Sequence, residues 1–426
     1  MTVTPSMLLR CAPRGRLRAA LGLALGAALY LLAAAVSAAP GGAAPERVVA
    51  VGDVHGDHDA LVRLLARAGL LDMGRRWVGG RTVLVQTGDY LDRGAQVREV
   101  LDLLMGLQSQ AAAAGGQVVV LLGNHEAMNL VGELRDVAPE ALAAFADEAS
   151  TQRREDALKA YQRVMGRQVS VSRPALSPPT VLSPKDWLGA HPLGDVEYRE
   201  ALGPDGRYGK WLRERPAAAQ IGDTLFVHGG IDPGFVKQSV EEVNGQVRDE
   251  LQRVDRVRRV LVDRGRALPF STLQELFDAA RRELMIAEAV ADGRADEYTG
   301  PSLGPGDLRL VQDFLRIGSW YLLNPNGPLW FRGYATWSSE EGATRMAAVL
   351  ERHGVARVVV GHTMMTSLRV TPRFGGRVFL IDTGMLSSYY KGGRASALDI
   401  QGADVRVIYE EANAEGSSPA AAPKPS

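Results

Sequence analysis

The chain has 426 residues, of which 46% are hydrophobic and 23% are charged. This composition suits one large folded domain with a sizeable core and excludes a chain that is disordered throughout. The 49 basic and 49 acidic residues give a formal net charge of zero, which argues against a nucleic-acid-binding surface.

The N-terminal segment has the pattern of a secretory signal. Arginines precede an apolar run over residues 19–36, and small residues follow at positions 36–38. We therefore predict a signal peptide over residues 1–38 and a periplasmic or secreted protein. An uncleaved membrane anchor is the alternative, because an apolar run of this length reaches the lower limit of a membrane span. Cys11, the only cysteine, lies inside the segment, which excludes a cysteine nucleophile in the mature chain.

Three short apolar runs over residues 47–51, 82–86 and 117–122 each end in a polar cluster. β-branched and aliphatic runs of this length are typical of buried strands. The segments between them, about residues 58–68 and 95–114, have the length of the helix that a right-handed βαβ crossover needs. The sequence therefore predicts three parallel strands whose polar carboxyl ends meet at one edge of a sheet. Ligands bind at this edge in open α/β sheets.

The polar clusters carry side chains that divalent metals prefer. They are Gly52-Asp53-Val54-His55-Gly56, the segment from Gly88 to Gly94 with Asp89, Asp92 and Arg93, and Gly123-Asn124-His125-Glu126. Two later apolar runs end in the same way, at His228 and at His362. Oxygen and nitrogen donors without sulfur suit divalent ions of intermediate hardness. This number of donors exceeds the needs of one catalytic ion, so the sequence predicts two ions bridged by Asp89. Two such ions would bind the attacking and leaving oxygens of a displacement at phosphorus.

In this order, the motifs resemble the phosphoprotein phosphatase family of metallophosphoesterases. Residues 124–136 (NHEAMNLVGELRD), 327–334 (GPLWFRGY) and 381–390 (IDTGMLSSYY) are similar to its bacterial Shewanella-like branch. The resemblance spans residues 47–409, nearly the whole chain after the N-terminal segment. It implies an α/β protein with the calcineurin-like metallophosphoesterase fold, a two-sheet β-sandwich flanked by helices.

The resemblance also implies residue roles. The metal ligands would be Asp53, His55, Asp89, Asn124, His228 and His362. Histidines in four separate clusters also favour a metal site over simple helix capping. His125 is the candidate proton donor to the departing oxygen, and the resemblance implies that Asp92 holds its other ring nitrogen. Arg93 offers a planar fork to phosphate oxygens, and the resemblance implies that Arg332 is a second phosphate-gripping arginine.

Inserted helices are expected within a domain over residues 46–411. The Ala-, Glu- and Arg-rich stretches predict helical insertions at about residues 130–220 and 235–320. Residues 412–426 are rich in small residues and proline, and we predict a disordered tail there.

Several further residues have structural interpretations. Asp57 is the expected N-cap of the first helix. Glu126 is expected to support the turn of its own polar cluster rather than to take part in chemistry. Four aromatic residues of the first insertion are expected to pack in a core rather than to line a groove: Trp187, Tyr198, Tyr208 and Trp211. Three late strands are expected to be antiparallel and to lie in a second sheet: residues 378–381, 397–400 and 405–409.

The resemblance implies hydrolysis of phosphorylated proteins or peptides, at phosphotyrosine, phosphoserine or phosphothreonine, by direct attack of a metal-bridging hydroxide. We expect manganese, with iron or zinc as alternatives. A hydrolase of dinucleoside polyphosphates or of other small phosphoesters, with the same fold, is an alternative, although such relatives tend to carry His-Ala-Gly where this chain has His228-Gly229-Gly230. A metal-binding but catalytically inactive protein is the alternative from another class. No nucleic-acid partner is expected, and a membrane is expected as partner only if the N-terminal segment stays uncleaved.

Overall fold

The structure, a computed structural model, describes residues 45–171, 181–293 and 303–410. The predicted signal peptide and the predicted C-terminal tail lie outside these residues, so both stay predictions. Among the described helices, none combines the length and the hydrophobicity of a membrane span.

The first sheet has the strand order β10-β9-β1-β2-β3. Its strands are β1 (Val48–Val51), β2 (Val83–Gln86), β3 (Gln117–Val120), β9 (Ser396–Gln401) and β10 (Asp404–Tyr409). β1, β2 and β3 run parallel, as predicted from the three apolar runs. β9 pairs antiparallel with β1, and β10 pairs antiparallel with β9. β1 therefore has a neighbour on each side, and all four of its residues are buried.

The second sheet has the strand order β4-β5-β6-β8-β7. Its strands are β4 (Ala218–Ile221), β5 (Thr224–Val227), β6 (Arg357–Val360), β7 (Thr371–Arg373) and β8 (Val378–Leu380). β5, β6 and β8 run parallel, and β4 and β7 pair antiparallel at the two edges. Apolar side chains from both sheets, including Ala50, Phe226 and Val359, form one buried cluster. The two sheets thus pack face to face, as a sandwich requires.

The prediction for the late strands is right about antiparallel pairing and wrong about the sheet of two of them. β8 lies in the second sheet, antiparallel to β7 and parallel to β6. β9 and β10 pair antiparallel with each other but belong to the first sheet. β9 joins the first sheet because β1 has a second edge, on the side away from β2. Without a neighbouring strand, the backbone N–H and C=O groups of this edge would be unpaired. β9 supplies their hydrogen-bonding partners. Periodicity indicates which residues form a strand, but it does not indicate which edge is open.

Helices connect and cover the two sheets. The crossovers of the first sheet are α2 (His58–Arg67) and α3 (Val97–Ala113), and α4 (Asn124–Val131) follows β3. Asp57 caps α2 as predicted, since its carboxylate accepts a hydrogen bond of 3.0 Å from the Ala60 amide. Short helices α13 (Gly333–Thr336) and α14 (Ser339–His353) belong to the second half of the chain, and their apolar residues pack with those of β5, β6 and β8.

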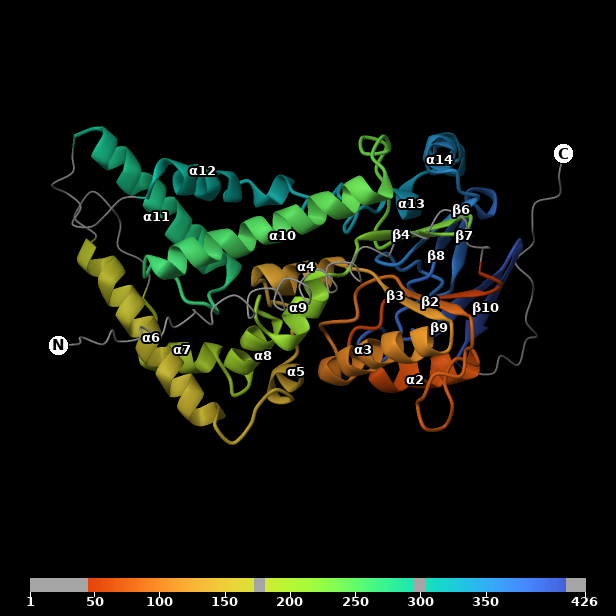
Figure 1. Cartoon of the computed structure of the whole chain (residues 1–426), viewed down its shortest axis with the longest axis horizontal. Helices are drawn as coiled ribbons and strands as arrows, with labels where there is room; N and C mark the ends of the chain where they lie inside the picture. Colours follow the sequence, from red (N-terminus) through yellow and green to blue (C-terminus); the bar gives the residue numbers. More distant parts are fainter. Residues whose placement is uncertain (1–44, 172–180, 294–302, 411–426) are drawn as a thin grey trace, which may run out of the picture. The chain divides into compact units, whose positions relative to one another are not determined.

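Two groups of helices fall within the ranges predicted for the insertions. The first group comprises α5 (Pro139–Ala143), α6 (Ser150–Val171), α7 (Pro184–Ala190), α8 (Asp195–Leu202) and α9 (Arg207–Arg213). The second comprises α10 (Val240–Asp263), α11 (Leu273–Ala291) and α12 (Pro305–Phe314). The long helix α10 packs against both α4 and β4 (Figure 1). The insertions therefore reach the helix that begins with Asn124 and His125.

The four aromatic side chains of the first insertion are buried, which confirms the predicted core role. Tyr198 and Tyr208 pack edge-to-face against Phe145, with ring centroids 5.0 and 5.9 Å from it. Trp187 stacks on His191 at 4.0 Å. These contacts hold the insertion together and dock it on the body of the protein.

Candidate active site

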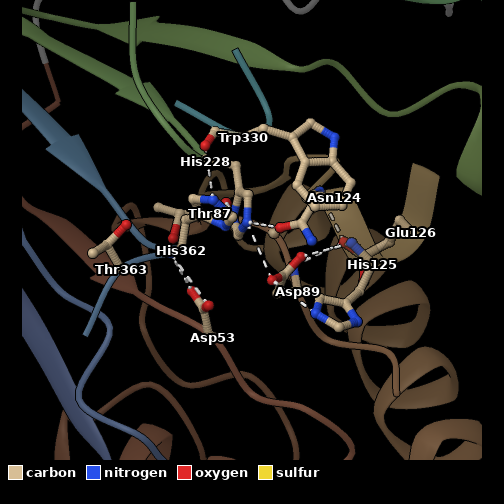
Figure 2. Close-up of polar contacts among 12 residues, drawn as sticks. Asp53, Thr87, Asp89, Asn124, His125, Glu126, His228, Trp330, His362 and Thr363 are labelled. Atoms are coloured by element: carbon tan, nitrogen blue, oxygen red, sulfur yellow. Dashed lines mark hydrogen bonds and ion pairs between the residues drawn. The ribbon is translucent and has the colours of Figure 1, made fainter. Parts of the chain in front are cut away.

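The carboxyl ends of five strands bring the six predicted ligands together. Asp53 and His55 follow β1, Asp89 follows β2, Asn124 follows β3, His228 follows β5 and His362 follows β6. All six side chains are buried. Figure 2 shows five of them, with Asn124 and His228 beside Asp89 and with Asp53 beside His362. The strand direction predicted from the sequence thus explains how residues far apart in the chain share one site.

Asp89 lies at the centre of this group. Its Oδ2 atom is 3.2 Å from Nε2 of His228, 3.8 Å from Nε2 of His125 and 4.0 Å from Nε2 of His55. Asp89 belongs to two sets of side chains whose donor atoms lie within 4.8 Å of one another, one with His55 and His125 and one with His228 and His362. Asp89 is common to both sets, which fits a carboxylate that bridges a pair of ions, with His125 of the first set beside the ions rather than among their ligands.

Asp382 is a buried carboxylate of the site that the sequence analysis did not identify as functional. It follows β8, and its carboxylate lies next to that of Asp53. Burial, with Asp89 nearby, raises the pKa of Asp382 to about 6. Burial and the Asp382 charge likewise raise the pKa of Asp53. The signal was present in the sequence, because an apolar run again ends in an acidic residue.

Backbone carbonyls orient the histidines as metal ligands. Nδ1 of His55 is 3.0 Å from the Leu91 carbonyl oxygen, and Nδ1 of His228 is 2.9 Å from that of Thr87. These carbonyls accept the Nδ1 proton, so Nε2 of each ring carries the lone pair. Burial lowers the pKa of His55 to about 3, which keeps its imidazole neutral, the form that binds a metal.

The donor set fits divalent cations on its own chemistry. Nε2 of His228 lies 2.9 Å from Oδ1 of Asn124 and 3.2 Å from Oδ2 of Asp89. A neutral imidazole that donates from Nδ1 places a lone pair against both oxygens, and a cation between them would turn this repulsion into attraction. The adjacent carboxylates Asp53 and Asp382 likewise place negative charge where water cannot stabilise it.

His125 and Asp92 form a hydrogen-bonded pair at the edge of the site. Nδ1 of His125 donates to Oδ2 of Asp92 at 2.7 Å, and both side chains are buried. Burial alone would lower the pKa of His125, but the charges of Asp89 and Asp92 raise it to about 9. The hydrogen bond to the Asp92 carboxylate favours the protonated imidazole, which is the form that a general acid needs. Its Nε2 atom faces the side of the site that Asp89 occupies.

Both predicted arginines line a pocket of about 400 Å³ next to this group. Nη1 of Arg93 lies 2.6 Å from Nε2 of His55 and donates to the hydroxyl of Tyr390. Arg332 is exposed, and its Nη1 donates to the His362 carbonyl at 3.1 Å and to Thr363 Oγ1 at 3.0 Å. Arginines at the wall of a pocket that contains carboxylates and imidazoles would bind the oxygens of a phosphate group.

Five non-glycine residues of the site have a left-handed backbone, which side chains with a Cβ rarely adopt. They are His55 (φ 48°), Asp89 (φ 57°), Asp92 (φ 66°), Arg93 (φ 66°) and His362 (φ 65°). Such residues cluster at functional sites where surrounding contacts hold them. Glu126 supplies four of these contacts, accepting from the amides of Asp89, Tyr90, Leu91 and Gly123 at 2.8 to 2.9 Å. Its predicted role in supporting the turn is confirmed.

Replacing Glu126 by glutamine should lower the free energy of unfolding by about 3 kcal/mol, because the amide nitrogen would face two buried N–H donors. Chemical denaturation of the metal-free variant and the metal-free wild type measures the difference. Glu155→Gln, at an exposed position of α6, is the matched control and should leave the free energy unchanged. Equal stabilities of the two variants would show that Glu126 does not hold the turn.

A two-sheet α/β sandwich that gathers carboxylates, an amide and imidazoles at its strand ends defines the class of metallophosphoesterases. Residues 46–365 match the family profile described as Calcineurin-like phosphoesterase. The chain belongs to the calcineurin-like phosphoesterase family, which confirms the fold and the resemblance inferred from the motifs.

Relatives with known names narrow the comparison. The chain is 33% identical to Shewanella-like protein phosphatase 2 of Arabidopsis thaliana over 216 residues, which is 48% of this chain and 51% of the relative. It is 21% identical to Shewanella-like protein phosphatase 1 of Plasmodium berghei over 339 residues, 80% of this chain and 67% of the relative. The chain thus spans about half the length of the Arabidopsis relative and two thirds of the Plasmodium one.

A solved structure shares the fold over most of the chain. The crystal structure of a cold-active protein-tyrosine phosphatase of a psychrophilic Shewanella matches with a TM-score of 0.52 at 25% identity. The match covers 86% of this chain and 78% of that chain. The family match thus shows a calcineurin-like phosphoesterase, and the similar proteins are named as protein phosphatases.

Proposed function

We propose that the protein is a phosphatase that hydrolyses phosphomonoesters of proteins or peptides with two divalent ions. The observation that carries this proposal is the pair of donor sets sharing Asp89, next to the His125–Asp92 pair in an arginine-lined pocket. The residues that would hold the ions are Asp53, His55, Asp89, Asn124, His228 and His362. Manganese is the proposed metal, with iron or zinc as alternatives. When bound, such ions stabilise charge on phosphoryl oxygens and acidify a water molecule.

The protein's own side chains would bind and orient the phosphate and supply a proton. Arg93 and Arg332 would bind the phosphate oxygens from the pocket wall. His125 would transfer its Nε2 proton to the oxygen of the departing alcohol or phenol as the phosphorus–oxygen bond breaks. Asp92 would hold the ring through Nδ1 and stabilise its protonated form. Because Asp92 is fully buried beside it, the ring keeps a fixed orientation with Nε2 free for the leaving group.

Phosphotyrosine is supported as a substrate by the similar Shewanella structure, which is that of a protein-tyrosine phosphatase. Phosphoserine and phosphothreonine belong to the same proposal. We place the protein in the periplasm or outside the cell on the basis of the N-terminal pattern alone, with the mature chain free of the segment over residues 1–38. No nucleic-acid partner is proposed, since the net charge is zero.

The dinucleotide-hydrolase alternative fits less well. A Cβ atom at Gly229 would lie 2.7 Å from the backbone nitrogen of Phe331 and 2.9 Å from that of Trp330. The alanine that such hydrolases tend to carry at this position would therefore displace the segment that precedes Arg332. The glycine keeps this segment close to His228, which favours the phosphoprotein substrate.

Metal removal and a substrate panel test the proposal. The purified protein with manganese should hydrolyse phosphotyrosyl or phosphoseryl peptides, because the pocket holds the charge pattern of a phosphate site. Chelation should lower this activity by at least about 100-fold and added manganese should restore it. A dinucleoside tetraphosphate is the comparison substrate. Turnover of the dinucleotide with inert phosphopeptides, or activity that survives complete chelation, would contradict the proposal.

A further inference from the structure

A chain of buried hydrogen bonds leads from the first insertion to His125. The hydroxyl of Tyr198 donates to Oδ1 of Asn129 at 2.7 Å, and Nδ2 of Asn129 donates to Oδ1 of Asp92 at 2.8 Å. Nδ1 of His125 donates to the other oxygen of Asp92. Each of the four side chains is at most 5% exposed. The chain therefore joins α8 to the proposed proton donor through direct contacts in a region without bulk water.

The amide of Asn129 can satisfy its neighbours in one orientation only. Besides Asp92, Nδ2 donates to the backbone carbonyl of His125 at 2.9 Å. Both of these partners are acceptors, so they require the NH₂ end of the amide. The hydroxyl of Tyr198 satisfies the oxygen at the other end. Without it, Oδ1 would be buried without a donor, and a rotated amide would place its oxygen against the Asp92 carboxylate.

We propose that Tyr198 and Asn129 are positioning residues for proton transfer, and this inference rests on the proposed phosphatase function. Tyr198 sets the direction of the Asn129 amide, the amide holds Asp92, and Asp92 holds the His125 ring toward the leaving oxygen. The first insertion thus takes part in the chemistry, although Tyr198 does not line the pocket that contains Arg93 and Arg332. Burial raises the pKa of Tyr198 well above its ordinary value, so the hydroxyl remains a donor.

Leaving-group dependence separates a positioning role from a structural one. A phenolate needs a proton as it departs, whereas a dinitrophenolate is a weak base and leaves with little help. Tyr198→Phe should therefore lower kcat/KM for phenyl phosphate about 10-fold, a fraction of the full effect of a general acid. For 2,4-dinitrophenyl phosphate the loss should stay within about 2-fold, since that reaction makes little use of the acid. Steady-state kinetics of the manganese enzyme measure both values.

Tyr208→Phe is the matched control. Tyr208 lies in the same insertion, is buried, and packs on the same Phe145. Its hydroxyl donates to Asp102 on α3 at 3.0 Å, outside the chain that ends at His125. Loss of this hydroxyl should leave the ratio of the two kcat/KM values at the wild-type level. Thermal unfolding of both variants compares their stabilities.

A second variant extends the test to Asn129. Asn129→Leu keeps a similar volume but removes all three hydrogen bonds of the amide, so it should lower kcat/KM for phenyl phosphate by at least about 10-fold. Adding Tyr198→Phe to this variant should change nothing further, because residues of one network are not additive. If one of the two single variants does not fold, the other single variant still tests the proposal.

The outcomes are distinct. Equal losses on the two aryl phosphates, or additive losses in the double variant, would overturn the positioning role. A wild-type protein with manganese that hydrolyses neither aryl phosphates nor phosphopeptides would overturn the proposed phosphatase function instead. A selective loss of activity on phenyl phosphate in Tyr198→Phe, with Tyr208→Phe unchanged, would support the positioning role.

Discussion

His125→Asn should lower kcat/KM on a phosphopeptide by about 10³-fold while the bound metal stays at the wild-type level. The asparagine amide can still donate to Asp92 in place of Nδ1, so the turn of the chain survives. It has no proton to deliver where Nε2 stood, so the leaving oxygen must depart unprotonated. Steady-state kinetics together with elemental analysis of the purified variant measure the two effects.

His353→Asn is the control for this substitution. His353 lies in the last turn of α14, outside the site, and its replacement should leave both activity and metal content unchanged. A His125→Asn enzyme with more than about a tenth of wild-type activity would contradict the assignment of the proton donor. Loss of metal together with activity would instead place His125 among the ligands.

Asp89→Asn should remove metal and activity together. Asp89 belongs to both donor sets, so its charge contributes to the binding of each ion. An amide in its place keeps the shape but removes the negative charge among three histidines. Even supporting residues of metal sites change affinity or activity by about 10- to 100-fold, so activity should fall by at least about 100-fold. Elemental analysis after gel filtration and phosphopeptide kinetics provide the measurements.

Asp102→Asn provides the comparison for Asp89→Asn, because Asp102 bonds Tyr208 on the surface of α3 and lies outside both donor sets. This variant should retain its full metal content. If Asp89→Asn also retained both ions and wild-type activity, the two donor sets would not act as one centre.

The positions of the main ligands could be predicted because they depend on a local pattern. Each apolar run that forms a strand ends in its polar residue, and parallel strands deliver these ends to one edge. Asp53, Asp89 and Asn124 therefore followed from β1, β2 and β3 without knowledge of contacts between them. His228 and His362 follow parallel strands of the second sheet, which extends the same rule to the other half of the sandwich.

Asp382 could not be placed in this way because its position depends on the direction of β8. A β8 strand antiparallel to β6 would carry Asp382 to the opposite end of the sheet from His362. The observed parallel pairing with β6 places the two residues at the same edge. The direction of β8 follows from its antiparallel hairpin with β7, which turns the chain back at the outer edge of the sheet. A local pattern does not contain this information.

The partner of Tyr198 was equally beyond the reach of the sequence. The ring was predicted to be part of a core, and it is buried against Phe145. The hydroxyl meets Asn129 only because α8 docks beside α4, 69 residues away in the chain. Amphipathic patterns predict which face of a helix is buried. They do not predict the hydrogen-bonding partner of the Tyr198 hydroxyl, which depends on how α8 packs against α4.

The place of β9 has a consequence for how the protein is made. β1, which leads into Asp53 and His55, acquires its second neighbour only from residues 396–401, near the end of the described chain. During synthesis, β1, the first of the described strands, therefore lacks a partner at one edge until β9 has been made. Until then its open edge is a template for pairing with other chains. A nascent chain that ends before Ser396 would carry all six proposed ligands but no completed first sheet to hold them.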